Sequence, residues 1–156
     1  MKIELSVIGK TAFKYLEEGI QIYEKRLKHY ARFDIYTIPD VKNIPLSNNA
    51  LKIKEGESIL THLSNEDVLV LLDEKGKTMT SIELAAFIEN QQIQATKKIV
   101  FQIGGAFGFS DAVYQRANVQ ISLSKMTFSH QMVRLLFIEQ LYRAFTILKG
   151  EKYHNE

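Results

Sequence analysis

The chain has 156 residues, of which 46% are hydrophobic and 24% charged, with a formal net charge of +2. This length suits one domain over residues 1–156, which would bury about 68–70% of the surface exposed by its unfolded form. The small net charge does not by itself require a nucleic-acid partner. The chain has no cysteine, which excludes disulfides, thiolate metal sites and cysteine nucleophiles.

Membrane and export signals are weak. Glu4 interrupts the only short apolar run near the start, so we expect no signal peptide. No apolar run approaches the ~20 residues that a membrane-spanning helix needs. We therefore expect a cytoplasmic protein that does not associate with a membrane.

The first half of the chain alternates predicted strands and helices. Lys2–Gly9 alternates apolar and polar residues, which predicts a strand. Thr11–Tyr30 places apolar residues three or four apart, the pattern of an amphipathic helix. Phe33–Ile38 predicts a second strand, Val41–Asn49 a loop, and Ala50–Leu63 a second helix.

The second half continues the alternation. Asp67–Leu72 and Lys98–Ile103 are almost continuously apolar, as buried parallel strands are. Asp73–Lys77 predicts a charged loop, and Ser81–Asn90 predicts a helix with Ser81 as its N-cap. A short helix capped by Ser110–Asp111 and ending at Arg116, then a strand at Val119–Leu123, complete the pattern before the last helix. This rhythm predicts an α/β fold with a mostly parallel sheet of five to six strands and helices on both faces.

Positive charges cluster on the polar side of the first predicted helix. They are Lys14, Lys25, Arg26, Lys28 and His29, with Arg32 just beyond, while Lys52 and Lys54 lie later in the chain. Two interpretations stay open: a solvated helix face, or a patch that contacts phosphates.

The last predicted helix, His130–Lys149, is apolar around almost its whole circumference. Only Glu139, Gln140, Arg143 and Thr146 form a polar sector. Such a helix is buried on more than one side, so we expect a second subunit to cover it in a homodimer.

Arg134 lies at the centre of the apolar face of this helix. A buried guanidinium needs a partner, because an unpaired charge there costs several kcal/mol. The partner is either a carboxylate, such as the partner subunit's Glu139, or a bound anion or substrate base.

Two loops follow successive buried strands, and ligands bind at that rim in open α/β sheets. Glycines at 104, 105 and 108 would let a ligand approach the backbone, although a plain tight turn explains them equally well. Neither a nicotinamide-dinucleotide fingerprint nor a P-loop is present. The second loop, Ser122–His130, is rich in hydroxyls. It is consistent with a ligand-binding loop, and also with a capped helix start in which Ser129 is the N-cap. The histidines lack metal-ligand spacing, so no metal is expected.

The combined motifs carry a family resemblance. IGGxxG at 103–108, SLSKMTFxHQMVR at 122–134, IEQLYRA at 138–144 and the final Tyr153-His154 resemble the ribosomal RNA large subunit methyltransferase H family, in the SPOUT class. KIxLxVIGK at 2–10 and YEKRL at 23–27 extend the resemblance over the whole chain.

The resemblance implies a carboxyl-terminal deep trefoil knot that binds S-adenosylmethionine, and a homodimer. It also implies methylation of N3 of a pseudouridine in 23S rRNA on assembled ribosomes. Carried over by motif, the residues that contact the methyl donor are Leu72, Gly104, Leu123, Ser124, Lys125, Met126, Thr127 and Phe128.

On the substrate side the resemblance implies Arg143, Tyr153 and His154. His154 would accept a proton or hydrogen-bond the RNA. We expect the short tail to fray until the partner subunit or RNA orders it, and we expect His130 to be structural.

The sequence departs from the family pattern at two positions. Ser129 stands where relatives typically have proline, so we expect a looser turn there. Asn155 stands where many relatives have a basic residue, so we expect the tail to make one fewer contact with RNA. Two other functions stay open: a SPOUT methyltransferase acting on tRNA, and a non-catalytic ribosome-binding module. The glycine turn and the Tyr-His tail argue against the module.

Overall fold

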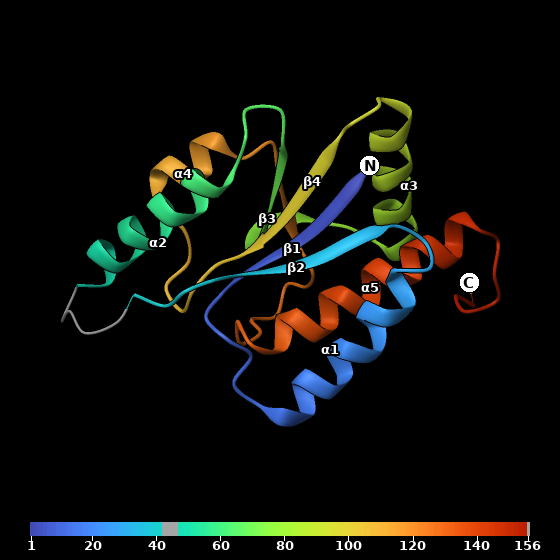
Figure 1. Cartoon of the computed structure of the whole chain (residues 1–156), viewed down its shortest axis with the longest axis horizontal. Coiled ribbons are helices and arrows are strands. Elements are labelled where there is room, and N and C mark those ends of the chain that lie inside the picture. Colours follow the sequence, from blue (N-terminus) through green and yellow to red (C-terminus); the bar gives the residue numbers. More distant parts are fainter. Residues whose placement is uncertain (42–46, 156) are drawn as a thin grey trace.

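The computed structural model describes residues 1–41 and 47–155. In these residues five strands alternate with five helices (Figure 1). The elements are β1 (Lys2–Ile8), α1 (Lys14–Leu27), β2 (Arg32–Ile38), α2 (Asn48–His62), β3 (Val68–Thr78), α3 (Ser81–Ile93), β4 (Lys98–Ile103), α4 (Asp111–Arg116), β5 (Val119–Ser122) and α5 (Met132–Leu148).

The strands form one sheet in the order β2-β1-β4-β3-β5, and every neighbouring pair is parallel. The predicted α/β class and parallel sheet are confirmed, with five strands in the described part of the chain. Because β3 lies between β4 and β5, the loops that leave the carboxyl ends of β4 and β5 meet at one rim, beside the middle of β3.

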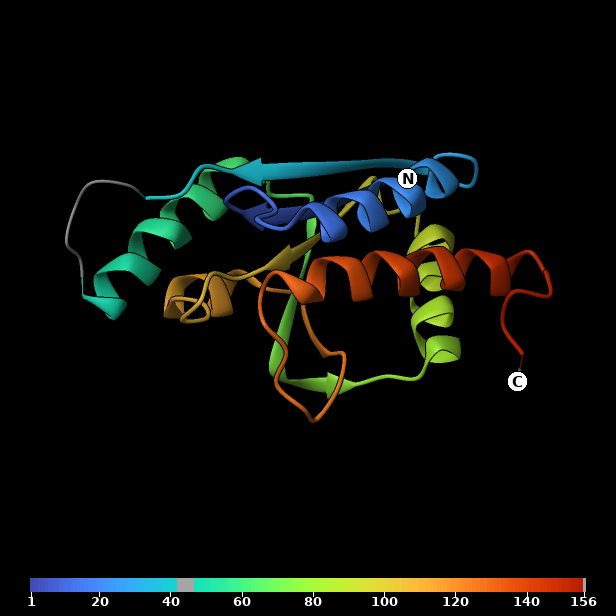
Figure 2. The ribbon, with the colours of Figure 1, turned by 90° about the horizontal axis from the view of Figure 1, so that it is seen from below.

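Helices cover both faces of the sheet, as predicted. Alternate strand residues such as Leu5 and Phe101 point toward α1, α3 and α5, where the larger core lies. Leu71 and Val100 point to the opposite face, where Ile59 of α2 and others form a smaller core with α4. Figure 2 shows α5 running alongside α1 on the first of these faces.

Packing within one subunit accounts for the apolar residues around α5. Phe137, Ile138 and Leu141 are fully buried in the core shared with the sheet, α1 and α3. Thr146, expected in the polar sector, is also fully buried, and its hydroxyl donates to the Arg143 carbonyl at 2.7 Å. The apolar character of the helix therefore does not require a second subunit.

The predicted charged loop after β3 is wrong in its limits, because the strand continues to Thr78. Leu72 and Lys77 both align with Ile121 of β5, so Asp73–Gly76 bulge out of the register. The bulge places the charged side chains outside the sheet, which is why this part of the sequence has the composition of a loop.

Helix starts differ from prediction by one to three residues, and the largest difference is in α1, which begins at Lys14 and not at Thr11. Thr80, not Ser81, caps α3 in a capping box with Glu83. Helix α2 already begins at Asn48, with the Ser47 hydroxyl accepting from the Ala50 amide. Of the loop predicted at 41–49, residues 42–46 lie outside the described residues.

The start of α5 also differs. The helix begins at Met132 after Gln131, whose side chain makes no capping bond. The Ser129 hydroxyl nevertheless accepts from the Met132 amide at 3.1 Å, so Ser129 still stabilises this start.

Candidate active site

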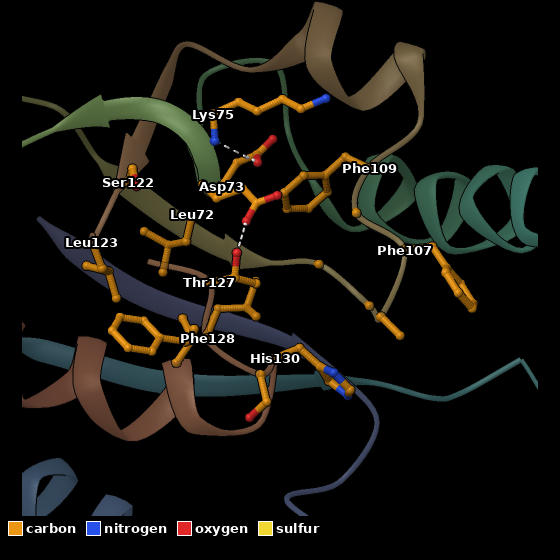
Figure 3. Close-up of a pocket in the computed structure, with 18 of the residues that line it drawn as sticks. Leu72, Asp73, Lys75, Phe107, Phe109, Ser122, Leu123, Thr127, Phe128 and His130 are labelled. Carbon is orange, nitrogen blue, oxygen red and sulfur yellow. Dashed lines mark hydrogen bonds between the residues drawn. The ribbon is translucent and has the colours of Figure 1, made fainter. Parts of the chain in front are cut away.

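A pocket of about 560 Å³ lies between the bulge of β3 and the carboxyl ends of β4 and β5 (Figure 3). This volume is in the range of small-molecule sites. Three segments line the pocket: Leu72–Lys75 at the bulge of β3, Ile103–Phe109 from the glycine turn with Tyr114 of α4, and residues of the segment from Ser122 to Val133. The rim predicted from strand order is thus hollow in the structure.

The bulge of β3 is tied to the other two segments. The Tyr114 hydroxyl donates to Asp73 Oδ2, and the Thr127 hydroxyl donates to Glu74 Oε2 at 2.7 Å. Burial and the bond to Asp73 raise the pKa of Tyr114, so this hydroxyl stays protonated and keeps donating. The bulge therefore joins α4 and the loop after β5 into one frame around the pocket.

The glycine turn brings bare backbone to the pocket. A Cβ at Gly104 would lie 3.2 Å from the ring of Phe109, which is itself buried under the turn. Gly108 has φ +85°, a conformation that side chains other than glycine rarely adopt. The glycines therefore meet two separate demands: space next to a ring, and a left-handed backbone.

The loop after β5 is held by its own hydroxyls. Ser122 Oγ donates to the Ser124 carbonyl at 2.7 Å, and Ser124 Oγ accepts from the Met126 amide at 3.0 Å. These bonds shape a compact loop, and most of its residues line the pocket. Of the eight residues expected to contact the methyl donor, all but Lys125 line this pocket, and Lys125 is exposed.

Arg134 has a partner that neither interpretation of the sequence foresaw. It is 2% exposed and donates to the carbonyl oxygens of Ile8 at 2.7 Å and Gly9 at 2.8 Å, and to Thr11 Oγ1 at 3.3 Å. It faces neither a partner subunit's carboxylate nor an open ligand site. Instead it fastens the start of α5 to the carboxyl end of β1.

His130 lines the pocket, which the expectation of a purely structural residue did not include. Burial, together with the nearby Arg134 charge, lowers the pKa of His130, although Asp40 opposes this shift. The imidazole is therefore neutral at neutral pH and presents one donor and one acceptor.

The three residues expected on the substrate side lie together. Arg143 contacts His154 Nδ1 at 3.3 Å, and its guanidinium lies 4.7 Å from the centroid of the Tyr153 ring. Arg143 and Tyr153 both donate to Glu139 Oε1, at 2.6 and 3.0 Å. The bond to Glu139 raises the pKa of Arg143, whereas burial chiefly raises the pKa of Tyr153.

This cluster lies at the far end of α5 from the pocket. Val133 lines the pocket, and Arg143 follows ten residues later on the same helix. At 1.5 Å per residue the two lie about 15 Å apart along the axis. One subunit therefore does not bring the predicted substrate residues to the predicted donor pocket.

The tail is ordered within the subunit, contrary to the fraying that we expected. Tyr153 packs edge-on against Tyr142, and its hydroxyl lies 3.4 Å from that of Tyr23 in α1. The Tyr30 hydroxyl of the segment after α1 donates to the Glu151 carboxylate at 2.8 Å. A tail this short would not be ordered by itself, and its aromatic packing against α1 and α5 holds it in place.

The basic residues of α1 are exposed, and both interpretations of them stay open. Lys28 pairs with Glu24 at 3.2 Å. The Arg26 guanidinium lies over the rings of Tyr23 and Tyr142, at 5.4 and 5.5 Å. Arg26 thus joins the aromatic cluster that orders the tail.

Several lining residues were not predicted as site residues: Asp73, Glu74, Phe107, Phe109, Tyr114 and Val133. A sequence signal existed for Asp73 and Glu74, since they directly follow the predicted strand Asp67–Leu72, just as the glycine turn follows Lys98–Ile103. Phe109 and Tyr114 had none, because only the packing of α4 brings them to the rim.

Membrane-spanning and metal-binding features are both absent from residues 1–41 and 47–155. No helix in these ranges is long and apolar enough to cross a membrane. Within the same residues, no group of three or more His, Asp or Glu side chains is arranged to hold a metal ion.

Known proteins resemble the chain over its full length. A family model described as a predicted SPOUT methyltransferase matches residues 1–154. Proteins named Ribosomal RNA large subunit methyltransferase H are 55% identical in Parabacteroides distasonis (100% of both chains) and 54% in Cytophaga hutchinsonii (99% of this chain, 100% of that protein). The one from Flavobacterium johnsoniae is 52% identical, with 100% of both chains covered. The chain therefore belongs to the SPOUT methyltransferases and, within them, to the ribosomal RNA large subunit methyltransferase H family, as its motifs predict.

Proposed function

We propose that the protein uses S-adenosylmethionine to methylate N3 of a pseudouridine in 23S rRNA of the assembled ribosome. The observation that carries this proposal is the 55% identity, over the whole chain, to a protein named Ribosomal RNA large subunit methyltransferase H. The nucleotide and the assembled state of the substrate come from the family resemblance. We place the reaction in the cytoplasm.

The pocket suits this methyl donor. Gly104 gives close access to backbone, while Leu72, Leu123 and Phe128 supply apolar wall for a flat ring such as adenine. Backbone amides and carbonyls of the loop after β5 are available to read the ring's polar edge. We include in the proposal the trefoil knot that the family implies around this loop.

The chemistry places simple demands on the protein. The donor supplies a methyl group on a sulfonium: the N3 lone pair forms the new N–C bond, the C–S bond breaks, and its electron pair stays on sulfur. The N3 proton must pass to a base, and His154 beside Arg143 is the candidate. Alignment of the two reactants in the site accounts for several kcal/mol of the rate enhancement.

We propose further that the active unit is a homodimer in which the tail of one subunit serves the pocket of the other. The separation of about 15 Å along α5 supports this arrangement. Exposed apolar side chains at the pocket, such as Met126 at 74% and Phe128 at 39% exposed, offer a surface that a partner would cover.

A mixing experiment tests this arrangement. The Gly104→Leu subunit would keep the tail but lose the pocket, and the His154→Ala subunit would keep the pocket but lose the tail. Each alone should have little activity, and a mixed dimer should regain activity through its one intact pair. No recovery, in a mixture shown by light scattering to contain dimers, would refute service in trans.

The function itself is tested by methylation of three substrates, with the product base identified by mass spectrometry. Ribosomes from a strain lacking the enzyme should accept a methyl group at one pseudouridine, and free 23S rRNA should accept far less. Methylation of tRNA would favour the alternative SPOUT function. Absence of S-adenosylmethionine binding in calorimetry would favour a non-catalytic ribosome-binding module.

A further inference from the structure

Helix α2 contacts the glycine turn from the face of the sheet opposite α5. Figure 1 shows α2 beside α4, the helix into which the turn leads. Two consecutive residues of α2 contact this region, Gly56 at the start of α4 and Glu55 at the turn. A Cβ at Gly56 would lie 3.1 Å from Val113 Cγ2 and closer still to Ser110 Oγ, the N-cap of α4. The preceding residue, Glu55, contacts the turn itself.

The Glu55 carboxyl group is packed against Gly105. A Cβ added at Gly105 would lie 2.8 Å from Glu55 Oε1 and closer still to Oε2, which is nearer than Cβ atoms in real structures lie. A side chain at 105 would therefore have to displace the Glu55 carboxyl group, although the backbone of Gly105 is not left-handed. Gly105 in turn lines the pocket.

Glu55 is an unusual residue for such a position. It is only 6% exposed, and Oε1 has no hydrogen-bond partner in the described part of the chain. Burial and the neighbouring Asp40 raise the pKa of this carboxyl, which favours its neutral form. A buried polar group without a partner costs stability, and such groups in native proteins call for an explanation.

We propose that Glu55 is a positioning residue for the methyl donor, acting through the contact of its carboxyl group with Gly105. The carboxyl fills the space behind the turn and holds its backbone forward at the pocket wall. A smaller side chain at 55 would let the turn retreat, whereas a larger one at 105 would push it into the pocket. This inference rests on the proposed use of S-adenosylmethionine.

Four variants separate positioning from stability. Glu55→Gln has the shape of the neutral acid and should keep the dissociation constant for S-adenosylmethionine within about threefold of wild type. Glu55→Ala and Gly105→Ala should each weaken binding about tenfold. The double variant Gly105→Ala/Glu55→Ala should bind better than Gly105→Ala alone, because the clash is removed. Glu57→Ala, at an exposed glutamate on the same helix, is the matched control and should change nothing.

The measurements are calorimetric affinity, the melting temperature, and KM for donor and ribosome separately. Positioning predicts a higher KM for the donor at an unchanged KM for the ribosome, and rescue by glutamine. Equal affinities in wild type and Glu55→Ala would overturn the proposal, as would a glutamine variant as weak as alanine.

Two further outcomes keep the test decisive. If Glu55→Ala does not fold, Glu55→Asp replaces it: the shorter side chain withdraws the carboxyl from the turn and should also weaken binding about tenfold, and unchanged binding overturns the proposal. If wild type binds no S-adenosylmethionine at all, the proposed function fails, and this inference fails with it. Binding by wild type with no effect of any variant refutes the role of Glu55 alone.

Discussion

Replacing Arg134 by methionine should destabilise the protein by about 3 kcal/mol. Methionine retains much of the apolar stem but removes the donors to the carbonyls of Ile8 and Gly9, which lie 2.7 and 2.8 Å away. Hydrogen bonds from a charged group contribute about 1.5 kcal/mol or more each, and these two acceptors would be left buried without a partner. The longer bond to Thr11 adds little to this value.

The assay is urea unfolding followed by circular dichroism, together with a thermal scan. For a domain of this size, 3 kcal/mol corresponds to a fall of about 6–12 °C in the melting temperature. Arg32→Met, at an exposed arginine, is the control and should change stability by less than about 0.5 kcal/mol. A loss of less than about 1 kcal/mol for Arg134→Met would refute the reasoning, since the guanidinium would then not be what fastens α5 to β1.

Three further predictions concern the pocket and the tail. Gly104→Leu should weaken S-adenosylmethionine binding by at least about tenfold in calorimetry, because a Cβ there already lies 3.2 Å from the Phe109 ring; unchanged affinity would mean that the pocket is misplaced. His154→Ala should leave that affinity intact but lower kcat about a hundredfold, and full activity would remove His154 from the reaction. The bond to Glu151 raises the pKa of Tyr30 from 10.0 to about 12, so its stabilisation is present below pH 10 and lost as pH rises through 12. Tyr30→Phe should remove this pH dependence from urea unfolding measured between pH 9 and 12, and an identical profile in both proteins would contradict the assignment.

Local pattern was sufficient for much of the fold. The apolar runs of β3 and β4 and the Ser110 cap of α4 lie where the sequence predicts them, because burial and capping act over a few neighbouring residues. The shift of the α3 cap to Thr80 was also readable, since threonine stands three residues before Glu83 as a capping box requires. The donor-side residues other than Lys125 share one pocket because the carboxyl ends of parallel strands meet at one edge.

What the sequence alone did not decide depends on residues far apart in the chain. The partners of Arg134 are carbonyls 125 and 126 positions away, and backbone acceptors leave no trace in the pattern of side chains. The strand register that makes Asp73–Gly76 a bulge is set by β5. In the sequence Glu55 is indistinguishable from an exposed charged residue of a helix, and only the packing of α2 against Gly105 shows its position. Periodicity shows which side of an element is apolar, but only tertiary packing decides which distant group each buried polar atom contacts. In this protein those long-range contacts shape the pocket.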